Sequence, residues 1–143
     1  MIAYLDSSVL LRVILRHPDK LAEWDTIETG ITSALAEVEC LRTLDRLRLR
    51  ANLPDQELAT RREAVYRLTE EMEVVEPRVV VLRRAAQPFA TPLGTLDAIH
   101  LATALLWQET RGETLVMATH HQALGLAARA SGLRVIGLTP AAA

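Results

Sequence analysis

Short apolar runs alternate with segments of helical periodicity along the whole chain. Apolar runs of three or four residues predict strands, and apolar residues that recur every three or four positions predict amphipathic helices. The predicted strands cover residues 2–5, 30–32, 73–75, 115–118 and 134–136. The predicted helices cover residues 7–15, 21–28, 34–50, 54–71, 96–110 and 122–131. This alternation predicts an α/β fold with a central, mostly parallel sheet flanked by helices on both faces.

Capping residues support several of these boundaries. Ser33 or Thr32 is expected to cap the helix that starts near residue 34, and Pro54 is expected at the first position of the following helix. Thr95 is a candidate N-cap for the helix at 96–110. Residues 79–86 fit a strand in their first half and a helix in their second, so the pattern leaves their type open.

Composition limits the size and class of the protein. A chain of 143 residues with 50% hydrophobic content fits one domain, residues 1–143, with a substantial core. Aromatic residues make up only 3%, so the core is expected to consist of Leu, Val, Ile and Ala. Neither a signal peptide nor an apolar run long enough to cross a bilayer is recognisable, which predicts a cytoplasmic protein without a membrane segment.

The charged residues give no global argument for nucleic-acid binding. The formal net charge is −2, although a local basic face remains compatible with it. Lys20 is the only lysine among 16 basic residues, which fits either bidentate phosphate binding by arginine or a bias in the genome's base composition. Cys40 is the only cysteine, which excludes a disulfide framework and a cysteine metal cluster.

Asp97 is the one carboxylate in an otherwise apolar helical segment, residues 95–105. A helix that is apolar on most sides is normally buried, and a buried carboxylate needs a compensating partner. Its position near the helix start offers one explanation, because backbone N–H groups and the helix dipole favour negative charge there. An arginine or a metal ion is the alternative.

Other ligand-type side chains are expected near Asp97. Asp6 directly follows the first predicted strand, and His120 and His121 follow the strand at 115–118. Sites in open parallel sheets form at the carboxyl ends of the strands, so these residues share one edge. Carboxylate oxygens suit Mg²⁺ or Mn²⁺, and such a cation would also compensate Asp97.

The long helix at 34–50 offers two further acids. Glu37 and Glu39 are two positions apart, about 200° around a helix, so both do not easily face one site. Glu39 has Arg42 and Arg46 on its side of the helix, and Glu37 has Leu41 on its side. Periodicity alone does not choose between them, and both also fit a role as surface acids.

Taken together, these segments resemble the PIN-domain ribonucleases, and most closely the VapC-type toxins of bacterial toxin–antitoxin pairs. The resemblance extends over essentially the whole chain, and its most specific part is the run Leu-Asp-Ala-Ile-His-Leu-Ala. The segments that carry it are Tyr4 to Ser8, Ser33 to Arg42, Leu96 to Ala102, and Val116 to His121 followed by Ala127, Gly132, Leu133 and Val135. The resemblance implies a single PIN-like domain.

The resemblance also implies roles for individual residues. It assigns the catalytic, metal-binding acids to Asp6, Glu39 and Asp97, and it selects Glu39 because the family acid precedes an arginine by three positions, here Arg42. Ser8 corresponds to a small hydroxyl residue often found beside the metal.

Two positions depart from the family pattern. His121 stands where a fourth aspartate is common, and Gly94 stands where similar toxins often have arginine. His121 is therefore an additional candidate metal ligand, since neutral imidazole can still bind Mn²⁺ but adds no negative charge. It also fits a role as a solvent-facing bystander.

The activity implied by the resemblance is endonucleolytic RNA hydrolysis assisted by Mg²⁺ or Mn²⁺. The expected partners are an RNA substrate, a small cognate antitoxin protein and a second copy of the chain. Trp24 and Ile27, and the helix at 54–71, are candidate contact regions for such partners. The candidate substrate-binding residues are Ser8, Arg12, Arg42 and Arg46, with Arg16, Arg48 and Arg50 nearby.

Other interpretations stay open at this point. Arg12 and Arg16 could receive an acidic antitoxin tail in place of RNA. His121 and Gly94 favour the alternative of a catalytically weakened PIN-fold module that binds RNA or an antitoxin without cleaving. A phosphoryl-transfer receiver or phosphatase fits poorly, because it usually needs a second acid beside Asp6 and a lysine on a later strand.

Overall fold

The computed structural model describes residues 1–140, and within them all five strands form one parallel sheet. The predicted α/β class with a central parallel sheet is confirmed. In chain order the elements are β1 (Ile2–Leu5), α1 (Ser7–Ile14), the 3₁₀ turn η1 (Trp24–Thr26), β2 (Thr29–Ser33), α2 (Ala34–Ala51), α3 (Asp55–Glu70), β3 (Glu73–Val75), α4 (Val79–Ala85), α5 (Thr95–Arg111), β4 (Val116–Ala118), α6 (Gln122–Ala130) and β5 (Arg134–Ile136).

The strand order, β3-β2-β1-β4-β5, determines where a site can form. From β1 the chain proceeds outward through β2 to β3, and β4 and β5 extend the sheet on the other side of β1. At the boundary between β1 and β4 the connections therefore leave in opposite directions. Such a switch point opens a crevice at the carboxyl ends of the two strands, where ligands of α/β proteins bind.

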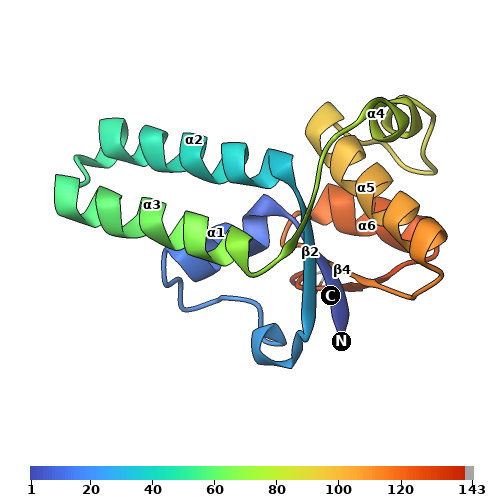
Figure 1. The fold of residues 1–143 in the computed structure, drawn as a ribbon, viewed down its shortest axis with the longest axis horizontal. Helices are drawn as coiled ribbons and strands as arrows, with labels where there is room; N and C mark the ends of the chain where they lie inside the picture. Colours follow the sequence, from blue (N-terminus) through green and yellow to red (C-terminus); the bar gives the residue numbers. More distant parts are fainter. Residues whose placement is uncertain (141–143) are drawn as a thin grey trace.

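Helices cover both faces of the sheet (Figure 1). Alternate residues of β1 point to opposite faces, so Leu5 packs with α1, α2 and α3, whereas Tyr4 packs with α5 and α6. Both side chains are essentially fully buried. The two cores meet only through the sheet, which holds α2 and α5 on opposite sides of the crevice.

Side chains cap the starts of α1 and α2, and two other expected boundaries need correction. Ser33 caps α2 through its side-chain oxygen, which accepts from the Leu35 N–H, as expected. Thr95 is the first residue of α5 and not its cap, because the backbone turns into the helix one residue earlier, at Gly94. Pro54 likewise occupies the N-cap of α3 and not the first helical position.

The predicted helix at 21–28 is wrong. This segment forms only the short turn η1, where the N–H groups of Trp24, Thr26 and Ile27 bond to the carbonyls three residues earlier. Leu21, Trp24 and Ile27 recur every three residues, which is the period of a 3₁₀ helix and is compatible with an α-helix over so short a run. Trp24 and Ile27 pack against the protein's own core and are partly exposed. Their role as a contact region for a partner stays a prediction.

Residues 79–85, whose type the sequence left open, form α4. In residues 1–140 no helix has both the length and the apolar character needed to cross a bilayer.

Candidate active site

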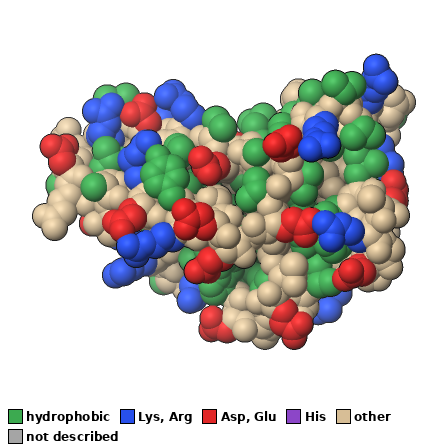
Figure 2. Space-filling view, viewed as in Figure 1, with side chains coloured by type: hydrophobic (Ala, Val, Ile, Leu, Met, Phe, Trp, Pro, Cys, Tyr) green, Lys and Arg blue, Asp and Glu red, His purple; other side chains and the backbone are tan. Residues whose placement is uncertain are grey.

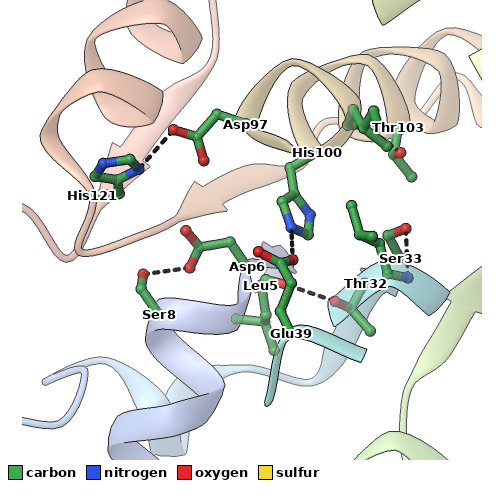
Figure 3. A network of polar contacts seen from close by, with 12 residues as sticks. Leu5, Asp6, Ser8, Thr32, Ser33, Glu39, Asp97, His100, Thr103 and His121 are labelled. Atoms are coloured by element: carbon green, nitrogen blue, oxygen red, sulfur yellow. Dashed lines mark hydrogen bonds and ion pairs between the residues drawn. The ribbon is translucent and has the colours of Figure 1, made fainter. Parts of the chain in front are cut away.

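A cavity of about 440 Å³ opens at the carboxyl ends of β1 and β4, at the switch point of the sheet. Its wall is contributed by the start of α1, by α2, by the start of α5 and by the turn before α6. The lining residues are Asp6, Ser7, Ser8, Glu39, Gly94, Thr95, Leu96, Asp97 and His121. The three acids expected from the sequence therefore surround one space (Figure 3).

Asp6 is the most firmly held of the three acids. It is only 3% exposed and caps α1, where its Oδ1 accepts from the Val9 N–H at 3.2 Å and from the Ser8 hydroxyl at 2.6 Å. The Thr119 hydroxyl donates to Oδ2 at 2.5 Å. A carboxylate offers about four acceptor positions, so the second position of Oδ2 remains for a further partner.

Asp97 lies in the first turn of α5, and its side chain is 15% exposed. Burial raises the pKa of this carboxyl above its ordinary value, and the negative charges of Asp6 and Glu39 raise it further. His121, whose Nδ1 lies 2.6 Å from Asp97 Oδ2, opposes that rise. Burial is thus the main cause of the raised pKa, and it disfavours the negative charge on Asp97.

Glu39, and not Glu37, faces the cavity. The Nε2 atom of His100 lies 2.6 Å from Glu39 Oε1, which draws the glutamate toward α5. Glu37 points toward α3, where the Thr69 hydroxyl donates to it at 3.4 Å. The structure therefore separates two acids that helical periodicity left equivalent.

The donor set fits a hard divalent cation. Three carboxylates line one cavity, and a cation there would stabilise the charged form of Asp97, whose pKa burial raises. Among residues 1–140 no three Asp, Glu, His or Cys side chains form a ready-made ligand cluster. An ion such as Mg²⁺ can still bind between carboxylates that do not form a close cluster, because it keeps several waters and binds directly to only one or two carboxylates.

The candidate substrate-binding residues divide into two groups. Ser8 lines the cavity, and its oxygen also accepts from the His120 N–H at 3.0 Å. Arg12 lies outside the cavity, with its guanidinium donating to the Asp19 carbonyl. Arg42 and Arg46 also lie outside, where they contact neighbours on α2.

The visible charges do not form a basic face. Figure 2 shows basic and acidic side chains interspersed over α2 and α3. Two of the α2 arginines, Arg42 and Arg48, pair with Asp45 between them.

Two residues that support the site were missed by the sequence analysis. Thr119 follows β4, and the register that pairs Leu5 with Ala118 brings it beside Asp6. Its position directly after a strand was a usable signal once β4 was placed next to β1. Tyr4 contacts the Nδ1 atom of His100 at 2.6 Å, a contact between residues far apart in sequence that no local pattern indicates.

Comparison with known proteins agrees with this geometry. The model of the PIN domain family matches residues 3–119. Ribonuclease VapC46 of Mycobacterium tuberculosis is 37% identical over 106 residues, which cover 71% of this chain and 72% of that protein.

Solved structures share the fold at lower sequence identity. FitAcB from Neisseria gonorrhoeae has a TM-score of 0.69 at 19% identity and covers 95% of this chain and 96% of its own. VapBC2 from Rickettsia felis, bound to a DNA fragment from its promoter, has a TM-score of 0.62 at 14% identity and covers 94% and 97%. The chain therefore belongs to the PIN-domain family and is a relative of the VapC-type ribonucleases.

Proposed function

We propose that this protein is a metal-dependent endoribonuclease, the toxin component of a toxin–antitoxin pair, with Asp6, Glu39 and Asp97 as its catalytic and metal-binding residues. The observation that carries the proposal is the meeting of these carboxylates, from three separate elements, around one cavity of a PIN-domain fold. The cation is Mg²⁺ or Mn²⁺, because the donor set consists of carboxylate oxygens.

The residues of the proposed site have different roles. The three carboxylates would hold the cation, directly or through its bound waters, and Ser8 and Thr119 fix the orientation of Asp6 through hydrogen bonds to its two oxygens. When bound, the cation polarises the scissile phosphate and makes water a better nucleophile at neutral pH. Gly94 and Leu96 form part of the cavity wall that the RNA chain would contact.

The relatives support the choice of substrate and partner. The relative in M. tuberculosis is named a ribonuclease, and one solved structure with this fold is a toxin–antitoxin complex from Klebsiella pneumoniae. We accordingly propose cellular RNA as substrate, a cognate antitoxin as inhibitor, and a homodimer acting in the cytoplasm. Arg12 lies outside the cavity, one helical turn beyond Ser8 on α1, and we propose it as a contact for a phosphate of the bound RNA.

Metal removal tests the proposed activity directly. Purified protein incubated with a mixed RNA pool and Mn²⁺ is expected to cleave RNA internally. EDTA should stop the reaction, and excess Mn²⁺ should restore it, because the acids alone supply no Lewis acid. The measurement is fragment formation on a denaturing gel, with Zn²⁺-free buffer as the control for contaminating metals. Cleavage that continues in EDTA contradicts the proposal.

The alternative is a PIN-fold module that binds RNA or an antitoxin without cleaving. His121 favours it, because a histidine occupies the position of a common fourth acid and pairs with Asp97. The same assay separates the two functions: RNA binding with Mn²⁺ but without cleavage supports the module.

His121 also leads to a prediction about metal choice. We expect wild-type protein to work better with Mn²⁺ than with Mg²⁺, since an imidazole beside Asp97 suits the softer ion. His121→Asp restores a hard oxygen ligand and is expected to raise the rate with Mg²⁺ several-fold. The ratio of kcat/KM with the two ions measures this, and an equal ratio in both proteins contradicts it. His17→Asp, at an exposed position, is the control.

A further inference from the structure

A buried hydrogen-bonded chain connects the sheet to Glu39. The Tyr4 hydroxyl and His100 Nδ1 are 2.6 Å apart, and His100 Nε2 and Glu39 Oε1 are 2.6 Å apart. Tyr4 is 0% exposed and His100 is 1% exposed, whereas the Glu39 side chain is 21% exposed at the cavity. Figure 3 shows the His100 ring directed from α5 toward Glu39.

The chemistry of the partners fixes the direction of each hydrogen bond. An ionised carboxylate only accepts, so His100 Nε2 donates to Glu39. Nδ1 is then the acceptor for the Tyr4 hydroxyl proton.

We propose that Tyr4 and His100 form a relay that holds the Glu39 carboxylate in its position toward the cation, which makes His100 a positioning residue of the site. This inference rests on the proposed metal-dependent function. His100 is not itself a reacting group, because it is buried and both of its ring nitrogens are occupied.

The relay matters because a glutamate side chain without an orienting hydrogen bond is not preorganised for metal binding. A glutamate side chain has three rotatable torsions, and ordering them on metal binding weakens the affinity. Here the ordering occurs on folding: Glu39 comes from α2 and His100 from α5, on opposite sides of the crevice. Hydrogen bonds that orient metal ligands typically contribute 10–100-fold to metal affinity.

A pair of substitutions at His100 separates the two halves of the relay. The amide nitrogen of Gln can take the place of Nε2, so His100→Gln keeps a donor for Glu39. The shorter Asn reaches only the position of Nδ1, so His100→Asn keeps a partner for Tyr4 and releases Glu39. His17→Asn makes the same chemical change at an exposed histidine whose ring contacts only the Asp19 N–H.

The primary measurement is Mn²⁺ binding by the free protein, followed by electron paramagnetic resonance without RNA. We expect His100→Asn to raise the Kd for Mn²⁺ by about 10–100-fold. His17→Asn should stay close to wild type, and His100→Gln, which loses only the Tyr4 contact, should raise the Kd less than His100→Asn does. In cleavage assays the Mn²⁺ concentration for half-maximal rate should shift in parallel, while kcat at saturating Mn²⁺ changes much less. A merely structural role for His100 would not produce this split.

Wild-type affinity in His100→Asn, or a loss in His100→Gln as large as in His100→Asn, overturns the relay. If His100→Asn does not fold, Tyr4→Phe decides the question, because it removes one hydroxyl and should still raise the Kd. An unchanged Kd in Tyr4→Phe also overturns the relay. A wild-type protein that binds Mn²⁺ but cleaves no RNA refutes the proposed function only, since the binding experiment still tests the relay.

Discussion

Asp97→Asn is expected to reduce RNA cleavage by at least about 100-fold, the upper end of the loss seen when only a ligand's hydrogen-bonding partner is removed. The substitution keeps the size and shape of the side chain but removes its negative charge. In the proposed site, Asp6 and Glu39 would then hold the cation with one acidic ligand fewer. Cleavage with saturating Mn²⁺ measures the effect, because added metal should not restore a missing ligand.

The same substitution is expected to leave the stability of the fold close to that of wild type or higher. Burial raises the pKa of Asp97, which means that the folded protein holds this charge at a cost. A neutral amide removes that cost, although it loses the ionic part of the contact with His121. We expect the Tm of Asp97→Asn within about 3 °C of wild type or above it, which corresponds to less than about 1 kcal/mol.

The combination of lost activity and kept stability distinguishes a functional acid from a structural one. Proteins keep such locally unfavourable groups where function needs them. The control is Glu37→Gln, which neutralises an acid on α2 that does not line the cavity and should leave cleavage unchanged. Full activity of Asp97→Asn would refute the site assignment.

Most of the fold could be predicted because it depends on local signals. Short apolar runs ended by Asp6 and by Ser33 mark β1 and β2, and both residues then cap the following helices. The segment at 21–28 could not be predicted, since three apolar residues spaced by three fit a 3₁₀ turn and an α-helix equally well. A choice between them needs the core against which Trp24 packs.

The site was predictable only in part, for a different physical reason. Strand ends identify Asp6 and the turn with His121, because parallel strands place their carboxyl ends at one edge. The contact between His100 and Glu39 joins residues 61 positions apart and depends on how α5 packs across the sheet from α2. Sequence periodicity shows which face of each helix is buried but not which two helices meet at a given residue. Without the family resemblance, Glu37 and Glu39 would have stayed equivalent.

Gly137→Ala is expected to destabilise the protein by about 2–4 kcal/mol and to impair the site as well. Gly137 has φ of 98°, a conformation that strains any residue with a Cβ atom. An added Cβ would also lie 2.6 Å from the backbone oxygen of Thr119. The Thr119 backbone cannot shift without an energetic cost, because its N–H donates a hydrogen bond to the Ile136 carbonyl.

The consequence for activity follows from the Thr119 side chain. Its hydroxyl donates to Oδ2 of Asp6, so a shift of the Thr119 backbone reorients an acid that we propose to bind the metal. Gly132→Ala is the matched control: its φ of 92° is nearly the same, but no atom lies within 4 Å of the added Cβ. Backbone strain alone should therefore destabilise Gly132→Ala, by about 1–2 kcal/mol, and the variant should keep its activity.

Urea unfolding of both variants separates strain from clash, since only the clash differs between them. A larger free-energy loss in Gly137→Ala, together with a several-fold fall in cleavage under conditions where both proteins are folded, supports the connection from β5 through Thr119 to Asp6. Equal losses of unfolding free energy in the two variants would mean that the Thr119 backbone moves away from the added Cβ without an energetic cost. The orientation of Asp6 would then depend only on α1, through the hydrogen bonds from the Ser8 hydroxyl and the Val9 N–H.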